Sequence, residues 1–277
     1  MELLSIPPRL STLGHPQRLA VFRLLMRRYP DRVPATEIAR ALDLKPNTLS
    51  SYLNALTQVG LIVQERMGTS LRYGIEINAV RDTLDYLVLD CCLGRPDICA
   101  FPLPQDRAPA RPKINVLFIC TGNSARSIFA EAILRDMGGE RFNVYSAGTH
   151  PYSELNPLAV ALLEAKGHDV RPLRAKHVSD FQGEDAPHMD FVFTVCDRAA
   201  NEDCPAWHGQ PVHGHFSTPD PVAVDGSDAE KALAFQHAYG SLWNRITLFV
   251  ERIDASMKRT DRQRIADDVA RLKETDT

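Results

Sequence analysis

The sequence predicts a protein of two domains, an α+β domain followed by an α/β domain with a parallel sheet and flanking helices. Three observations support this prediction. A length of 277 residues suits two domains better than one. The segment 101–113 carries four prolines and is typical of an extended linker. Hydrophobic periodicity is helical before this linker, whereas a continuous apolar run typical of a buried strand follows it.

Helical periodicity dominates the start of the first domain, residues 1–100. Apolar residues recur at core spacing over 17–29, and further helices are expected over 36–42 and 48–59. Thr36 is a candidate N-cap of the second of these helices. Gly60 is expected to end the third, because glycine readily adopts the left-handed conformation that follows a helix.

The second and third helices, joined by a short turn, form a predicted helix-turn-helix. The third carries leucines on one face, and its outward face is small and polar: Asn47, Ser50, Ser51 and Asn54. Two alternating runs, 61–66 and 71–77, predict a β-hairpin, the wing of a winged helix. Arg66 and Arg72 flank its tip, within reach of DNA phosphates. Operator DNA is the expected partner, read by the outward face of the third helix.

This domain resembles the ArsR family of dimeric repressors through residues 13–19, the helix that ends at Gly60, and the wing at Gly68. The resemblance implies a DNA-binding homodimer formed through this domain. Winged helices also serve in protein–protein contacts, so a domain that does not bind DNA remains an alternative. The first hundred residues hold 12 basic and 10 acidic side chains, a net charge of +2, and the remainder has a net charge of −5. This asymmetry only hints at a nucleic-acid partner.

A last helix of this domain, expected over 78–93, ends in a group of cysteines: Cys91, Cys92 and Cys99. Trivalent arsenic is a soft ion and favours three thiolates. Part of the ArsR family senses arsenite through such a group, so the resemblance implies that arsenite is a regulatory ligand here. The alternative is that Cys91 or Cys92 packs in the dimer interface as a small hydrophobic residue.

The second domain, residues 114–250, opens with an apolar run that leads directly into Cys120. This order predicts a strand, an oxyanion-binding loop and the start of a helix, where backbone N–H groups and the helix dipole create positive potential. Cys120 is the expected nucleophile, with a pKa lowered by that field. The predicted oxyanion-binding residues are Thr121, Gly122, Asn123, Ser124, Ala125, Arg126 and Ser127. Arg126 adds a planar set of donors suited to a tetrahedral oxyanion.

These residues resemble the low-molecular-weight phosphatase fold in its arsenate-reductase branch. Further matching stretches lie at 146–149, 193–197, 204–205 and 219–221. Asp220, held between two prolines, is the candidate general acid. Val222 stands where phosphatases of this family usually carry an aromatic residue, which counts against an aryl phosphate as substrate. Ser124 and Ser127 are expected to hydrogen-bond the thiolate, and Asn123 to hold the loop, because asparagine tolerates a left-handed φ.

Two more cysteines favour reduction over phosphate hydrolysis. Cys196 ends a buried strand, and Cys204 follows in a polar loop. In the reductase branch a second cysteine attacks the nucleophile and a third resolves the disulfide; the resemblance maps these roles onto Cys196 and Cys204. Otherwise Cys196 is a core thiol and Cys204 an incidental loop residue. No tightly bound cofactor is expected, only an external thiol reductant of thioredoxin or glutaredoxin type.

The sequence therefore predicts an arsenite-responsive repressor fused to a thiol-relay arsenate reductase. The alternatives are a protein-tyrosine phosphatase, a catalytically idle oxyanion-binding module, and a regulator that senses another thiophilic metal. The cysteines and the absence of a signal peptide or membrane-spanning run suggest a cytoplasmic protein without a membrane partner. Residues 251–277 are expected to form a charged, solvated helical tail.

Overall fold

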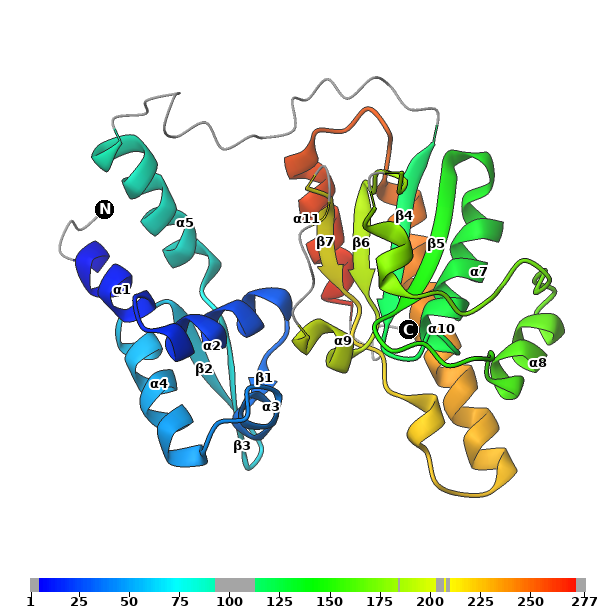
Figure 1. Ribbon diagram of the computed structural model, residues 1–277, viewed down its shortest axis with the longest axis horizontal. Helices are drawn as coiled ribbons and strands as arrows, with labels where there is room; N and C mark the ends of the chain where they lie inside the picture. Colours follow the sequence, from blue (N-terminus) through cyan, green and yellow to red (C-terminus); the bar gives the residue numbers. More distant parts are fainter. Residues whose placement is uncertain (1–4, 93–112, 184, 203–206, 208–209, 273–277) are drawn as a thin grey trace. The chain divides into compact units, whose positions relative to one another are not determined.

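The computed structural model describes residues 5–92, 113–183, 185–202, 207 and 210–272. The chain divides into two compact units, Met1–Leu103 and Pro104–Thr277 (Figure 1). The division falls within the segment 101–113 that the sequence predicts as a linker, of which residues 101–112 lie outside the described residues.

The first unit combines helices with a small antiparallel sheet of order β1-β3-β2. Its elements are α1 (Ile6–Leu13), α2 (Pro16–Arg27), β1 (Val33–Pro34), α3 (Ala35–Ala41), α4 (Pro46–Gln58), β2 (Ile62–Met67), β3 (Ser70–Ile75), α5 (Ile77–Tyr86) and the π-helical turn η2 (Leu87–Cys91). Apolar side chains from α2, α3, α4 and the hairpin form its core. The predicted helix-turn-helix and wing are α3–α4 and β2–β3.

Local details differ from the prediction. Thr36 is not the N-cap of α3, because the helix begins at Ala35 and Pro34 precedes it in an extended conformation. α4 begins earlier than expected because Pro46 fits the first turn of a helix, where its missing N–H costs nothing. Gly60 follows α4 with a φ of 73°, as its predicted role requires. The two-residue strand β1 is too short to leave a periodic signal.

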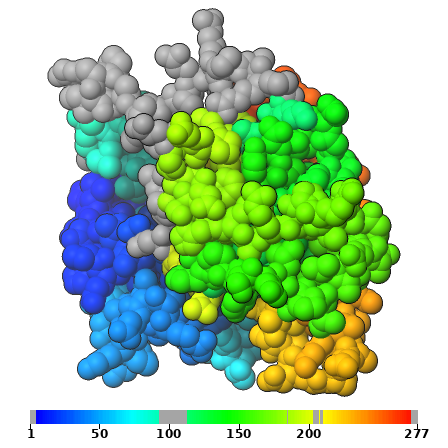
Figure 2. All heavy atoms as spheres, turned by 45° about the vertical axis from the view of Figure 1, so that its right-hand side comes forward, coloured from blue at the N-terminus to red at the C-terminus, as the bar shows by residue number. Residues whose placement is uncertain are grey.

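The second unit contains a four-stranded parallel sheet of order β5-β4-β6-β7. The strands are β4 (Ile114–Cys120), β5 (Phe142–Gly148), β6 (Phe191–Thr194) and β7 (Val212–His215). All seven residues of the central strand β4 are buried, which explains its continuous apolar run. Residues of the second unit form a continuous packed surface in the space-filling view (Figure 2).

Helices flank this sheet, as the sequence predicts. They are α7 (Arg126–Gly138), α8 (Pro157–Ala165), α9 (Asp197–Asn201), α10 (Asp228–Arg252) and α11 (Arg259–Ala270). Phe249 of α10 meets the rings of Phe142, Phe191 and Phe193 on the sheet, with centroid distances of 5.0–6.0 Å. These aromatic contacts fix α10 against β5 and β6. Of the described helices, none combines the length and the hydropathy needed to cross a bilayer.

The C-terminal segment differs from the expected solvated tail. Helix α11 buries Ala266, Val269 and Ala270, which lie on one face at spacings of three and four residues. That face packs against β7, where Ala266 approaches Gly214. The charged residues that dominate the composition of α11 occupy its other faces. The helix therefore belongs to the fold of the second unit.

Candidate active site

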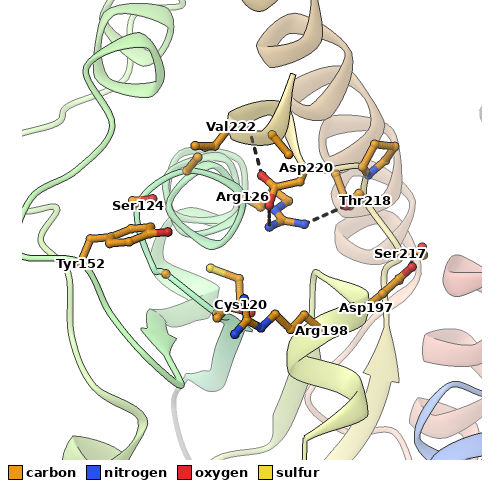
Figure 3. Close-up of a pocket in the computed structure, with 15 residues that line it drawn as sticks. Cys120, Ser124, Arg126, Tyr152, Asp197, Arg198, Ser217, Thr218, Asp220 and Val222 are labelled. Carbon is orange, nitrogen blue, oxygen red and sulfur yellow. Dashed lines mark hydrogen bonds and ion pairs between the residues drawn. The ribbon is translucent and has the colours of Figure 1, made fainter. Parts of the chain in front are cut away.

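The loop that follows β4 lies at the switch point of the sheet. Strands β5 and β6 flank β4 on its two sides, so the chain leaves β4 where the strand order reverses, the usual ligand position in such sheets. Cys120 is buried, and its Sγ accepts a hydrogen bond from the Asn123 N–H at 3.1 Å. The Ser127 hydroxyl lies 2.9 Å from the same sulfur. Helix α7 begins at Arg126, so its first turn faces the thiol (Figure 3).

The segment after β5 fixes this loop from outside. Four loop carbonyl oxygens accept backbone hydrogen bonds of 2.9–3.1 Å, from Thr149 to Cys120, from His150 to Thr121, from Tyr152 to Gly122 and from Asn156 to Ser124. Gly148 makes this approach possible. A Cβ there would lie 2.7 Å from the Thr121 carbonyl oxygen and 3.0 Å from the Cβ of Asn123. These contacts fix the orientation of the loop's peptide groups before any ligand arrives.

Asn123 connects the loop to two other segments. It is fully buried with a φ of 44°, the left-handed conformation that asparagine tolerates. Its Nδ2 donates to Ser127 Oγ at 2.8 Å and to Ser146 Oγ at 2.9 Å, and its Oδ1 accepts from the Lys176 N–H at 2.7 Å. The side chain thus orients the Ser127 hydroxyl that lies beside the thiol.

A buried carboxylate supports this network from behind. Glu131 of α7 is only 4 % exposed, and it accepts hydrogen bonds from Ser146 Oγ, from Lys176 Nζ at 3.0 Å and from Arg135. Two cations offset the desolvation cost of the buried carboxylate. Because Ser146 also contacts Asn123, the network extends from the charged cluster to the nucleophile loop.

Arg126 and Asp220 pair with each other at the edge of the cavity (Figure 3). The guanidinium donates from Nη2 to Asp220 Oδ2 at 2.7 Å and from Nη1 to the Thr218 carbonyl oxygen at 3.2 Å. The other carboxylate oxygen of Asp220 accepts from the Val222 N–H at 3.1 Å. The predicted oxyanion ligand and the predicted general acid are therefore paired in this structure.

Burial raises the pKa of the Cys120 thiol, and the neighbouring Cys196 thiol raises it further. The Ser127 hydroxyl and the Arg126 guanidinium lower that pKa, but they do not reverse the net direction. The expectation of a lowered pKa is therefore wrong for this structure. The sequence indicates the favourable field of the helix start, but it does not show that the sulfur is buried beside the Cys196 thiol.

The second predicted thiol also reaches the loop. Cys196 is 1 % exposed and precedes α9, and its Sγ accepts from the Ala199 N–H at 3.4 Å. The hydroxyl of Thr121 lies 3.6 Å from the Cys196 sulfur. Cys204 lies outside the described residues. The structure thus brings Cys196 close to Cys120 at the nucleophile loop, so two of the three predicted redox cysteines are neighbours.

The cavity above Cys120 has a volume of about 540 Å³. Among the predicted residues that line it are Thr121, Gly122, Ser124, Ala125, Arg126, Asp220 and Val222, whereas Asn123 and Ser127 lie buried behind the loop. Sequence analysis missed further lining residues: Tyr152, Asp197, Arg198, Ser217 and Thr218. All five follow β5, β6 or β7, whose carboxyl ends meet at this edge of the sheet. Their positions shortly after three strands of the sheet were the sequence signal that could have identified them.

The predicted DNA-reading residues of the first unit lie on one helix. Asn47, Ser50, Ser51 and Asn54 of α4 are all exposed, opposite the buried leucines of the same helix. Arg66 is exposed on β2, whereas Arg72 is half-buried and donates to the Arg32 carbonyl oxygen at 3.5 Å. The outward polar face is therefore available to a groove of DNA.

The predicted sensor cysteines lie partly within the described residues. Cys91 is exposed and ends the π-helical turn that extends α5, and Cys92 is half-buried beside it. The Cys92 N–H donates to the Leu87 carbonyl oxygen at 3.0 Å, a hydrogen bond across five residues. Cys99 lies outside the described residues. Both described thiols are free of disulfides.

Comparison with known proteins agrees with both units. Residues 115–259 match the family described as low molecular weight phosphotyrosine protein phosphatase, and residues 13–65 match a helix-turn-helix domain. The chain is 35 % identical to an arsenate reductase of Bacillus licheniformis over 50 % of this chain and 96 % of that protein. It is 34 % identical to an arsenate reductase of Bacillus subtilis over 49 % of this chain and 94 % of that protein. A solved arsenate reductase in the phosphate-binding state is 24 % identical with a TM-score of 0.43, over 51 % of this chain and 99 % of that one. The chain therefore belongs to the low molecular weight phosphotyrosine protein phosphatase family and carries a helix-turn-helix domain before its phosphatase-like domain.

Proposed function

We propose that this chain is an arsenate reductase fused to an arsenite-responsive repressor. The observation that carries the enzyme proposal is the second buried thiol, Cys196, whose sulfur lies 3.6 Å from the Thr121 hydroxyl of the nucleophile loop. A phosphatase needs one thiol and a water molecule, whereas reduction of an oxyanion needs two electrons. A pair of thiols supplies them. The similarity to curated arsenate reductases supports the same choice of substrate.

In the proposed reaction, arsenate binds the loop amides and Arg126, which gives up its contact with Asp220. The thiolate of Cys120 attacks arsenic, and Asp220 protonates the departing hydroxyl, which leaves as water. Cys196 then attacks the Cys120 sulfur. The sulfur–arsenic bond breaks, its electron pair stays on arsenic, and arsenic leaves as arsenite while the two thiols become a disulfide.

We further propose that Cys204 resolves this disulfide and passes it to an external dithiol of thioredoxin or glutaredoxin type. Under this proposal no tightly bound cofactor is required, because the dithiol supplies both electrons of each cycle. The burial of Cys196 and its proximity to the loop support this order, because a buried thiol is less accessible to an external reductant.

The test is arsenite production from arsenate by the full chain, with and without thioredoxin and its reductase. We expect turnover only with the reductant. The Cys120→Ser variant should lose turnover by at least about a thousandfold, because a hydroxyl neither ionises nor transfers electrons here. Cys204→Ser should still release arsenite in a single turnover but not cycle. Retained turnover in Cys120→Ser would contradict the mechanism.

One observation supports a second candidate function, the hydrolysis of aryl phosphates. Tyr152 lines the cavity and is 62 % exposed, so its ring supplies an aromatic surface that Val222 lacks. Under this candidate, water replaces Cys196 in the second step. Turnover of p-nitrophenyl phosphate that exceeds arsenite formation in kcat/KM would favour it.

The regulatory half of the proposal combines the exposed polar face of α4 with the cysteines after α5. We propose that a dimer of the first unit binds operator DNA, and that arsenite binds Cys91, Cys92 and Cys99 and releases it. Three thiolates match the preference of trivalent arsenic. The enzyme would thus produce the ligand that its own regulatory domain detects.

A further inference from the structure

His215 ends β7 and is completely buried, with both ring nitrogens in hydrogen-bond contact. Its Nδ1 lies 2.8 Å from Thr194 Oγ1, and its Nε2 lies 3.0 Å from Asp197 Oδ1. Thr194 and Asp197 are the residues two before and one after Cys196. One imidazole therefore holds the chain on both sides of the second thiol.

The same strand end also contacts the other side of the cavity. The hydroxyl of Ser217 donates to Asp197 Oδ1 at 2.8 Å, and the carbonyl oxygen of Thr218 accepts from Arg126 at 3.2 Å. The segment that follows His215 thus spans from the Cys196 turn to the oxyanion-binding arginine.

The Cys196 turn needs such support. Helix α9 has five residues, which is too short for a helix to be stable by itself. The contact between the Ala199 N–H and the Cys196 sulfur is long, at 3.4 Å. By contrast, the imidazole is completely buried and its contacts to Thr194 and Asp197 are shorter, at 2.8 and 3.0 Å, so they fix the start of α9 more strongly than the helix does.

We infer that His215 is a positioning residue for disulfide formation, an inference that rests on the proposed reductase function. It holds Cys196 where its sulfur can attack Cys120 and form the S–S bond as the sulfur–arsenic bond breaks. A misplacement of about 1 Å in a reacting group costs about a hundredfold in rate. The earlier step, attack of Cys120 on the oxyanion, does not involve Cys196 and should depend little on His215.

Three variants of the full chain separate positioning from folding. His215→Leu removes every contact of the imidazole with Thr194 and Asp197. His215→Gln keeps a donor that can reach Asp197, so it should retain most of the parent's rate of arsenite release. His168→Leu is the matched control, because His168 is also a buried histidine bonded at both ring nitrogens, to Asp136 and Tyr239, and neither partner is a site residue.

The first measurement is a single turnover of the reduced protein with arsenate and no reductant, followed by arsenite release. We expect His215→Leu to be slower by about ten- to a hundredfold. Hydrolysis of p-nitrophenyl phosphate by the same variant should change by less than about twofold in kcat. His215→Gln should recover to within a few-fold of the parent. In His168→Leu the ratio of arsenite release to p-nitrophenyl phosphate hydrolysis should equal that of the parent, even if this variant is less stable.

The second measurement does not depend on arsenate. In the Cys204→Ser background, equilibration with reduced and oxidised glutathione gives the effective concentration of Cys196 toward Cys120, with the disulfide identified by peptide mapping. His215→Leu should lower that value tenfold or more. An unchanged value, or an equal loss of phosphate hydrolysis and arsenite release, would overturn the inference. If the parent forms the disulfide but makes no arsenite, the proposed function fails and the positioning role stands.

Discussion

Gly148 decides how closely the segment after β5 approaches the nucleophile loop. A methyl group there would meet the Thr121 carbonyl oxygen at 2.7 Å, and both neighbours are backbone or buried atoms that cannot easily move. We expect Gly148→Ala to lower the free energy of unfolding by about 1–3 kcal/mol and to reduce kcat, because the loop amides shift. Denaturant unfolding and arsenite formation measure the two effects.

The control for this prediction is Gly240→Ala, since a Cβ at Gly240 in α10 meets nothing within 4 Å and its backbone is helical. Alanine suits a helix interior better than glycine, so unchanged or slightly raised stability with unchanged kcat is expected. If Gly148→Ala keeps full activity, the loop does not depend on this close packing.

At the scale of single residues, the sequence predicted the loop better than its surroundings. Cys120 and Arg126 could be predicted as cavity residues because a strand, a loop and a helix start follow one another without interruption. Asp220 could be predicted from a rigid Asp-Pro pair. Tyr152 and Asp197 could not, because each becomes a cavity residue only when three parallel strands are paired in a particular order. The pKa direction of Cys120 failed for the same reason, since burial is a property of the assembled fold.

At the scale of elements, α4 and the wing should contribute to DNA binding in different ways. Arg66 is exposed on β2, so its positive charge can contact phosphates without reading bases. We expect Arg66→Ala to weaken binding to all sequences alike and to reduce the slope of log K against log salt by about 1. Titration of an operator and of an unrelated duplex at several salt concentrations measures this.

Asn54 on the outward face of α4 provides the contrast. Asn54→Ala should leave the salt slope unchanged and reduce discrimination between operator and unrelated DNA by about 1–3 kcal/mol. A parent protein whose affinity does not change with salt would instead favour a winged domain that binds protein.

Helix α11 is predicted to stabilise the second unit. Val269 is completely buried between this helix and the domain. Val269→Ala should therefore cost about 2 kcal/mol, since it removes two methylene-sized groups from a packed site. Arg264→Ala, on an exposed face of the same helix, should stay within about 0.5 kcal/mol of the parent. Equal effects of the two substitutions would mean that α11 is dispensable for stability.

Elements with a strong hydrophobic periodicity could be predicted from the sequence, whereas short elements and helices with a narrow apolar face could not. The helix-turn-helix and hairpin appear in the sequence because each buries one regular face. The tail was expected to be solvated because charge dominates its composition, yet three small or apolar residues at Ala266, Val269 and Ala270 suffice to dock it. Composition alone therefore underestimates a helix with a narrow apolar face.

At the scale of the whole molecule, the proposal predicts that arsenite releases the protein from its operator. Replacement of Cys91, Cys92 and Cys99 together by serine should leave a repressor that stays bound in arsenite. Arsenite can shift the DNA-bound population only if it binds the DNA-free conformation more tightly. DNA binding at increasing arsenite concentration, for the parent and the triple variant, measures this.

The matched control replaces Cys120 and Cys196 by serine and should respond to arsenite like the parent. If the triple variant still leaves DNA while this control does not, the sensor lies in the enzyme domain. The two variants thus assign the response to one unit without any assumption about how the units are arranged.

The pairing of Arg126 with Asp220 also bears on affinity for oxyanions. Because the guanidinium already contacts a carboxylate at 2.7 Å, an incoming oxyanion exchanges one negative partner for another. The net electrostatic gain is then smaller than for a vacant cation. In the proposed reaction, entry of the oxyanion therefore exchanges one anion for another at Arg126 and separates Asp220 from its partner. Under the same proposal, Asp220 competes with the product for the Arg126 guanidinium, which favours product release.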